Sequence, residues 1–444
     1  MLVFAHGIVG RADLPIPEAM FAAAAAAVLV LSFLALAGLW STPRLQRRQE
    51  RRLVRVPVLV DVVVGALGVL VFAVSAYAGL AGTENERDNL APTVVYVAMW
   101  VGVAFASLLL GDVWRLISPW RAIGRTAGWA MGKVTEAPEP LAYPERLGRW
   151  PAAAGIVGFG ICELAWGTAR EPGPLAVIML VYLVAMLVGM SLYGVEAWTR
   201  NADPLGVYFG LFGAIGMLIR RDGAVYGRPP LVGTGRIDGR HGMVAVVIAG
   251  LGVTAFDGAS EGPLFNDVLP HLQTFFGDLG LGPERALEAG FVVGLLVVTA
   301  IIALIWALAV GGMPPVEGRR PGPPLVHSLI PILAAYVVAH YFSLLVYQGQ
   351  DLWRLASDPL GRGSDLFGGA RATIDYGVIT ATQIWYVQIV VLVVGHVAAL
   401  VLAHDRALVL YGSHRDATRS QIVMLVLMVI FTCLGLWLLS AANG

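Results

Sequence analysis

Long uninterrupted apolar runs constrain this chain more than any other feature. A helix needs about 20 apolar residues to cross the hydrocarbon core of a bilayer. Ten runs approach that length: 17–40, 58–82, 93–111, 150–168, 174–198, 242–256, 289–313, 326–348, 377–403 and 420–440. Only 14% of the 444 residues are charged, against roughly 25% in soluble domains. The sequence predicts an all-α fold, a polytopic transmembrane helical bundle of about ten spans that forms one transmembrane domain over 1–444.

Basic residues orient this bundle. The segments 41–57, 112–149 and 199–241 hold six Lys or Arg each. In total, 23 of the 30 basic residues fall on that side of the predicted bundle and seven on the other. Because cytoplasmic loops carry the excess of Lys and Arg, both termini are predicted to be extracytoplasmic. The net charge is zero, and the lipid bilayer accounts for the arginine-rich loops, so no nucleic-acid partner is expected.

The connecting segments differ in their predicted roles. Residues 1–16 read as an extracytoplasmic tail, and 257–288 and 349–376 as extracytoplasmic loops long enough to cover a site. Cytoplasmic segment 199–241 contains an apolar piece, 207–219, too short to cross, which predicts a re-entrant or interfacial segment. The mixture of Trp and Arg in 111–125 is typical of a helix lying at the interface.

A short internal match bears on the architecture. The sequence DVWRLIS at 112–118 resembles DLWRLAS at 351–357. Each follows a predicted span, and the two spans are five apart, so the copies would face opposite sides of the membrane. This predicts a possible 5+5 inverted repeat, an arrangement that many secondary transporters use.

Five polar side chains are predicted to share one level beneath the outer surface. Ionisable residues inside a bilayer are costly unless they are paired or hydrated, so each is a functional candidate. At ~1.5 Å per residue, Glu163 lies roughly 8 Å and His340 roughly 12 Å below the outer ends of their spans. Gln383 and Tyr386 lie at a similar depth, and Asp257 ends its span on the same side. These residues predict a pocket open to the outside.

The spacing of polar residues extends this pocket along two helices. His340, Ser343 and Tyr347 follow an i, i+3, i+7 pattern and so share one helix face. The catalytic candidates are Glu163, Asp257, His340 and Tyr386, and the candidates for binding a small lipophilic or ionic ligand are Ser343, Tyr347 and Gln383. The alternative is that Tyr and Gln join helices by hydrogen bonds and that Glu163 is simply protonated.

One imidazole and two carboxylates are the minimum set for a divalent transition metal with open positions. The predicted ligands are His340, Glu163 and Asp257, to which His6 and His271 could be added if their segments fold over the pocket. Haem is disfavoured, because His340 and His396 differ in depth by about 16 Å at the helical rise.

A second set of polar residues lies toward the predicted cytoplasmic side. It comprises Asp61, Glu196, His396 and His404. Most lie close enough to the surface to be hydrated. The alternative interpretation is an inner gate or a proton route.

Four stretches carry a resemblance to a known family: AHGIVGRADLPIPE (5–18), GDVWRLISPWRAIGR (111–125), VTAFDGASEGPLF (253–265) and SDPLGRGSDLFG (357–368). In these the chain resembles bacterial polytopic membrane proteins commonly labelled fenitrothion hydrolase. The resemblance implies a multi-pass protein of a bacterial cytoplasmic membrane that hydrolyses organophosphorus-type esters, with or without the assistance of a metal.

Three functions stay open on the sequence. In a metal-assisted hydrolase of lipophilic esters, the metal would lower the pKa of bound water and polarise the phosphoryl oxygen. In a secondary transporter or permease, a carboxylate near mid-membrane would couple transport to protons. The third is a metal-handling accessory protein of a membrane complex.

Overall fold

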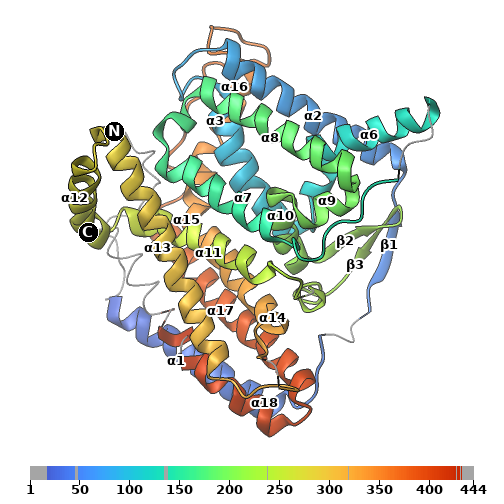
Figure 1. The fold of residues 1–444 in the computed structure, drawn as a ribbon, viewed down its shortest axis with the longest axis vertical. Helices are drawn as coiled ribbons and strands as arrows, with labels where there is room; N and C mark the ends of the chain where they lie inside the picture. The colour runs from blue at the N-terminus through green and yellow to red at the C-terminus, as the bar shows by residue number, and fades with distance from the viewer. Residues whose placement is uncertain are drawn as a thin grey trace. The chain divides into compact units, whose positions relative to one another are not determined.

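The computed structural model describes residues 18–45, 49–134, 139–237, 239–318, 320–426, 428–430 and 432. Their fold is mostly helical, which confirms the all-α prediction in outline (Figure 1). The chain divides into two compact units. Unit 1 consists of 1–49, 231–343 and 376–444, and unit 2 of 50–230 and 344–375. Because neither unit is one half of the chain, the inverted repeat stays a prediction.

Seven helices among the described residues are long and apolar enough to cross a membrane: Val58–Ala81, Leu90–Leu110, Pro172–Tyr193, Met243–Ser260, Pro283–Gly311, Gly322–Gln348 and Ala381–Tyr411. They coincide with seven of the ten expected runs. The expected spans 17–40 and 150–168 correspond to shorter apolar helices, Ala23–Leu39 and Trp150–Ala165. Most of 420–440 lies outside the described residues. The total of ten spans therefore stays a prediction.

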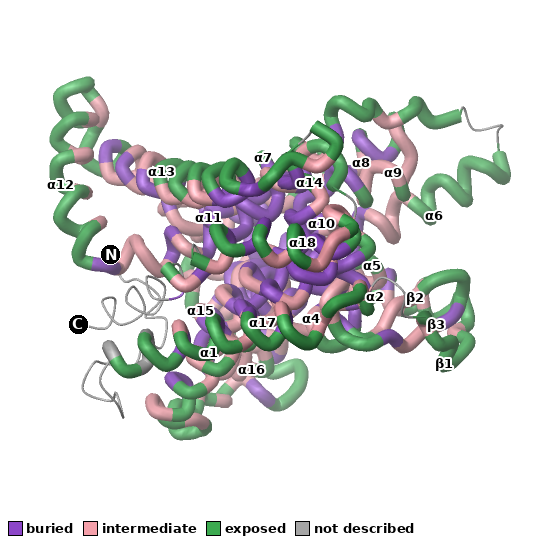
Figure 2. Tube along the Cα trace, turned by 90° about the horizontal axis from the view of Figure 1, so that it is seen from below, coloured by how far each residue is buried: buried purple, intermediate pink, exposed green. Residues whose placement is uncertain are grey.

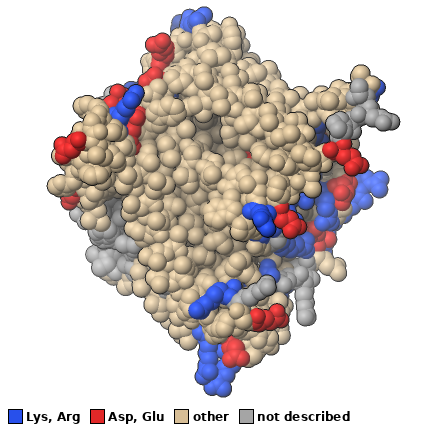
Figure 3. Space-filling model, viewed as in Figure 1, with Lys and Arg blue, Asp and Glu red and all other residues tan. Residues whose placement is uncertain are grey.

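The surface agrees with a bilayer setting. On the face drawn in Figure 3, most of the surface carries neither Lys or Arg nor Asp or Glu side chains. Large apolar side chains are also exposed on the candidate spans, among them Leu67 and Leu70 in unit 2 and Ile301 and Leu304 in unit 1. Lipid can cover such side chains, whereas water disfavours a contiguous apolar surface of this kind.

Unit 2 is built from helices of very different lengths and a small sheet. Its elements are β1 (Arg51–Arg55), α2 (Val58–Ala81), α3 (Leu90–Pro92), η2 (Thr93–Gly102), α4 (Val103–Leu110), α5 (Trp114–Ile117), α6 (Pro119–Val134), α7 (Trp150–Gly160), η3 (Ile161–Ala165), η4 (Gly167–Arg170), α8 (Pro172–Tyr193), α9 (Val195–Asn201), α10 (Pro204–Ile215), β2 (Leu218–Arg221), β3 (Ala224–Gly227) and α16 (Asp351–Ser357). Helices α2 and α8 approach closely at Gly79. A Cβ there would lie 2.5 Å from the Pro172 carbonyl oxygen and 2.7 Å from the Ala176 Cβ.

Helix α10 lies in the core of unit 2. Its Tyr208, Phe209 and Phe212 are fully buried, and the Tyr208 ring stacks on Trp100 with 4.5 Å between centroids. The aromatic rings of this apolar piece fill the interior of the unit. The re-entrant or interfacial placement expected for 207–219 stays a prediction.

The segment 111–125, expected to be an interfacial helix, also turns its tryptophan side chains toward the interior of the unit. It forms α5 and the start of α6. Trp114 and Trp120 are 4% and 2% exposed, and their rings lie 5.1 Å apart. Both indoles therefore pack inside unit 2, although the later part of α6 is exposed.

A three-stranded antiparallel sheet, with strand order β1-β3-β2, was not expected from the sequence (Figure 1). Arg52 pairs with Tyr226 and Arg55 with Ala224, while Arg220 pairs with Val225. Paired strands must lie on one side of a membrane. The sheet therefore places the arginine-rich segments 41–57 and 199–241 on the same side, in agreement with the basic-residue distribution, and which side is cytoplasmic stays a prediction.

Unit 1 carries the remaining elements: α1 (Glu18–Leu39), η5 (Thr234–Arg236), α11 (Met243–Ser260), α12 (Pro263–Asp278), α13 (Pro283–Gly311), α14 (Gly322–Leu325), η6 (Val326–Leu329), α15 (Ile330–Gln348, which belongs to this unit as far as Ser343), α17 (Ala381–Tyr411) and α18 (His414–Ser420). Small residues bring α15 and α17 together. A Cβ at Gly395 would lie 2.3 Å from the Ala335 Cβ, and Ala335, Ala339 and Leu392 belong to one buried cluster. Small residues at helix contacts are typical of membrane bundles.

Candidate functional site

The candidate site is a buried polar cluster between α11 and α15 in unit 1. One carboxylate oxygen of Asp257, Oδ2, lies 2.9 Å from His340 Nε2 and accepts a 2.7 Å hydrogen bond from the Tyr341 hydroxyl. Asp257 is 4% exposed and Tyr341 fully buried. The His340 side chain is 14% exposed. We refer to Asp257, His340 and Tyr341 as the aspartate cluster.

Local structure explains why these three groups meet. Asp257 lies in the last turn of α11, whose preceding residues are almost all apolar and buried. His340 and Tyr341 are consecutive on α15, and their side chains diverge by about 100° around the helix, so the carboxylate lies between them. The imidazole also lies close to the backbone of α11, since a Cβ at Gly258 would be in ordinary van der Waals contact with His340 Cε1 at 3.6 Å.

The aspartate cluster joins a carboxylate to the one side chain that ordinarily changes charge near neutral pH. With Asp257 ionised, a neutral His340 donates from Nε2 to the carboxylate. A further proton at Nδ1 converts that hydrogen bond into an ion pair. Both groups belong to candidate spans, so this contact joins two helices through ionisable side chains.

The other predicted binding residues are distributed differently. Ser343 and Tyr347 follow His340 on α15 and are 3% and 9% exposed, with Ser343 in unit 1 and Tyr347 in unit 2. Glu163 also belongs to unit 2, where it lies on the π-helical turn η3. A pocket shared by Glu163 and the aspartate cluster stays a prediction.

Gln383 and Tyr386 are not part of the cluster contacts in the structure. Gln383 forms a capping box at the start of α17: its Oε1 accepts from Thr380 N at 2.8 Å, and its own backbone N–H donates to Thr380 Oγ1. Tyr386 is 48% exposed. The side-chain amide of Gln383 binds in this cap because the backbone N–H groups at a helix start need hydrogen-bond partners. The glutamine of α17 that does reach α15 is Gln388, which donates to the Ala339 carbonyl at 3.0 Å.

The described residues contain no group of three or more His, Cys, Asp or Glu side chains able to hold a metal ion. Among the described candidate ligands, Asp257 and His340 are in contact. His271 is exposed on α12, and His6 lies outside the described residues. The metal site expected at His340, Glu163 and Asp257, to which His6 and His271 could be added, stays a prediction.

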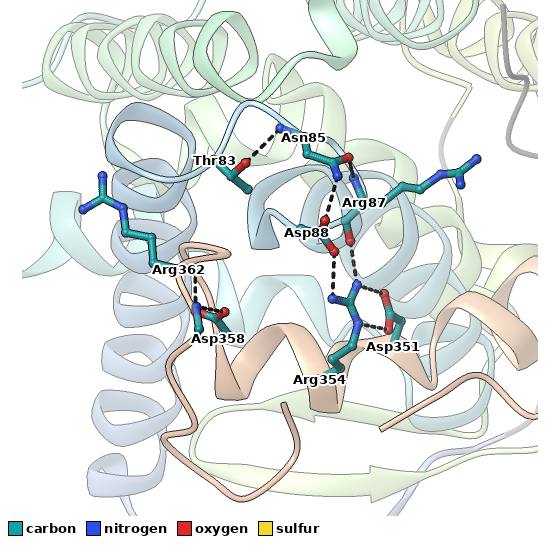
Figure 4. A network of polar contacts seen from close by, with 9 residues as sticks. Thr83, Asn85, Arg87, Asp88, Asp351, Arg354, Asp358 and Arg362 are labelled. Atoms are coloured by element: carbon teal, nitrogen blue, oxygen red, sulfur yellow. Dashed lines mark hydrogen bonds and ion pairs between the residues drawn. The ribbon is translucent and has the colours of Figure 1, made fainter. Parts of the chain in front are cut away.

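A second polar network fastens the loop that follows α2 to α16 in unit 2 (Figure 4). Arg354 binds Asp351 through Nε at 2.7 Å and Asp88 through Nη1 at 3.0 Å, and Asn85 donates to Asp88 at 2.6 Å. The hydrogen bonds with Asp351 raise the pKa of the Arg354 guanidinium, so its charge is permanent. In the same unit, Asp358 accepts from two backbone N–H groups. A permanently charged clamp of this kind fixes loops rather than exchanging protons.

The residues of the predicted inner set also have partners. In unit 2, Asp61 pairs with Arg220 at 2.8 Å, and Glu196 pairs with Arg115 at 2.9 Å and Arg121 at 2.6 Å. In unit 1, His396 Nδ1 lies 2.8 Å from the Leu392 carbonyl, and His404 Nε2 lies 2.9 Å from the Trp40 carbonyl.

Comparison with known proteins gives no match for this chain among family models, curated proteins or solved structures. The resemblance found in the sequence therefore stays a prediction, and the function is argued from the geometry alone.

Proposed function

We propose that the protein is a proton-coupled membrane transporter in which the aspartate cluster is the protonation site. The observation that carries this proposal is the 2.9 Å contact between Asp257 and His340. It joins two ionisable groups on two different candidate spans. Ionisable residues at such positions commonly serve proton relays and ion pathways.

The coupling follows from the chemistry of the pair. Proton uptake at His340 Nδ1 strengthens the attraction between α11 and α15, and proton loss weakens it. Tyr341 holds the carboxylate in place in both states through its hydroxyl. A helix contact whose strength depends on protonation can bias a protein between two conformations, which is the requirement for coupling proton movement to that of a solute.

An acid jump on protein-containing vesicles tests the proposal without knowledge of the solute. Vesicles adsorbed on a solid-supported membrane electrode are switched from neutral to acidic buffer, and the transient charge movement is recorded. We expect a transient in the wild type that Asp257→Asn and His340→Gln abolish and Tyr341→Phe retains, since a phenol does not ordinarily titrate between neutral and acidic pH. Asp203→Asn, in unit 2, is the matched control for loss of a buried carboxylate. Equal currents from wild-type, Asp257→Asn and protein-free vesicles would overturn the proposal.

A metal-assisted hydrolase is the second proposal. It is supported by the adjacency of one carboxylate and one imidazole, which supply two of the three protein ligands that a catalytic zinc site uses. Metal analysis of the purified protein separates the two functions. A stoichiometric metal that is lost in His340→Ala would favour the hydrolase, and its absence from both proteins would favour the transporter.

A further inference from the structure

Helix α12 divides into an apolar and a polar half. It connects α11 to α13, and both of these are candidate spans. At about 100° per residue, all of its Leu, Phe and Val side chains fall on one half of the helix surface. Its Asp, Asn, Gln, Thr and His side chains fall on the other half.

The apolar half of α12 is itself divided in two. One part packs on α13: Phe265 lies edge-to-face with Phe291 at 5.1 Å, and Leu269 would lie 2.9 Å from a Cβ at Gly290. The other part is a stripe that points away from this contact. Leu264, Val268, Phe275 and Leu279, the last of which directly follows the helix, form the stripe, and each is at least 50% exposed. We call these four residues the α12 stripe.

Continuity with the lipid-facing surface identifies what covers the stripe. In Figure 2, α12 lies across the end of α13 at a steep angle and is drawn mostly as exposed. Its neighbour α13 exposes Leu296, Val297 and Ile301 further along the same helix. A helix that crosses the end of a membrane span lies near the plane of the interface, where an apolar face reaches acyl chains and a polar face reaches water.

We infer that α12 is an interfacial helix whose stripe is inserted into the leaflet on the side where α11 ends and α13 begins. The orientation predicted from the basic residues places this leaflet on the extracytoplasmic side. The bound partner is phospholipid acyl chain rather than a charged headgroup, because α12 contains no Lys or Arg. The inference is independent of the aspartate cluster and of proton coupling.

Neighbouring residues provide a matched test. Asp267 and Val268 are both exposed, as are Thr274 and Phe275, so water would reach all four positions equally if no membrane covered the stripe. After replacement of Cys162 and Cys433 by serine, each position is changed to cysteine in turn and labelled with an environment-sensitive nitrobenzoxadiazole. The protein is then reconstituted in phosphatidylcholine vesicles that contain a nitroxide on the acyl chain.

We expect acyl-chain nitroxide to quench the labels at 268 and 275 several-fold more than those at 267 and 274, and aqueous iodide to show the reverse order. Replacing part of the phosphatidylcholine by phosphatidylglycerol should leave this pattern unchanged. Equal quenching within each pair would overturn the inference. So would protection at 268 and 275 that disappears when the protein is diluted into excess lipid, because that result would identify a second copy of the chain as the covering partner.

Discussion

Two buried aspartates, one in each unit, differ in the chemistry of the side chains that bind them. Asp203 in unit 2 is 1% exposed and Asp257 in unit 1 is 4% exposed. Asp203 accepts from the Trp120 indole at 2.8 Å, the Tyr182 hydroxyl at 2.8 Å and the Leu205 backbone N–H at 3.2 Å. None of these three donors changes charge near neutral pH.

The difference lies in the nature of the donors. Asp203 is the N-cap of α10, and its hydrogen bonds tie that helix to α6 and α8. Asp257 instead faces an imidazole, which can bind or release a proton while it keeps its contact. The comparison teaches that burial of a carboxylate does not by itself indicate function, whereas the chemistry of its partners does.

Removal of the two carboxylates should give the largest contrast. Asp203→Ala leaves an indole, a hydroxyl and a helix start without their acceptor, so we expect a loss of about 3–5 kcal/mol in the free energy of unfolding. For Asp257→Ala we expect about 1–3 kcal/mol, because the partly exposed His340 can be hydrated. Denaturation followed by tryptophan fluorescence in detergent measures both. A larger loss for Asp257 than for Asp203 would reverse the assignment of structural and functional roles.

The closeness of the helix contacts differs between α2 and α8 in unit 2 and α11 and α15 in unit 1. Gly79→Ala would place a methyl group 2.5 Å from a backbone oxygen of α8, so we expect a loss of about 1–3 kcal/mol in unit 2. Gly258→Ala meets the His340 ring at 3.6 Å, an ordinary contact, and should change stability by less than about 1 kcal/mol. The midpoints of thermal unfolding compare the two variants. Equal losses would mean that α11 and α15 are as tightly fitted as α2 and α8.

Site residues can be predicted from the sequence where a polar side chain stands among apolar neighbours. His340 stands out because it interrupts an apolar run and Asp257 because it ends one, and the structure brings them into contact. Asp203 was missed because it lies in an arginine-rich segment, where an aspartate is unremarkable. Its Asp-Pro-Leu sequence nevertheless carries the signal of a helix start, a capping aspartate followed by proline at the first helical position.

Other elements could not be read from periodicity alone. Depth in the membrane predicts Gln383 as a pocket residue, whereas Thr380, three residues earlier, forms with it the signature of a capping box. The sheet was missed because Arg51–Arg55 is short and its arginines were interpreted only as markers of topology. Tyr341 was overlooked because a tyrosine beside a histidine has no distinctive spacing, and only the position of α11 makes it a donor to Asp257.

The smallest expected effect concerns Glu196, an exposed counterpart to the two buried carboxylates. Burial alone would raise the pKa of Glu196, but Arg121 and Arg115 outweigh it and hold that pKa below the ordinary value of 4.5. A carboxyl group whose pKa is lower in the folded state stabilises the protein at pH values above its unfolded-state pKa. This stabilisation is lost as the pH falls through the folded-state pKa.

Because the Glu196 side chain is 47% exposed, solvent screening limits this stabilisation to under about 1 kcal/mol. Unfolding midpoints measured from pH 7 down to pH 3 should therefore fall slightly more for the wild type than for Glu196→Gln. Parallel curves for the two proteins would show that the pairs with Arg115 and Arg121 contribute nothing to the stability of unit 2.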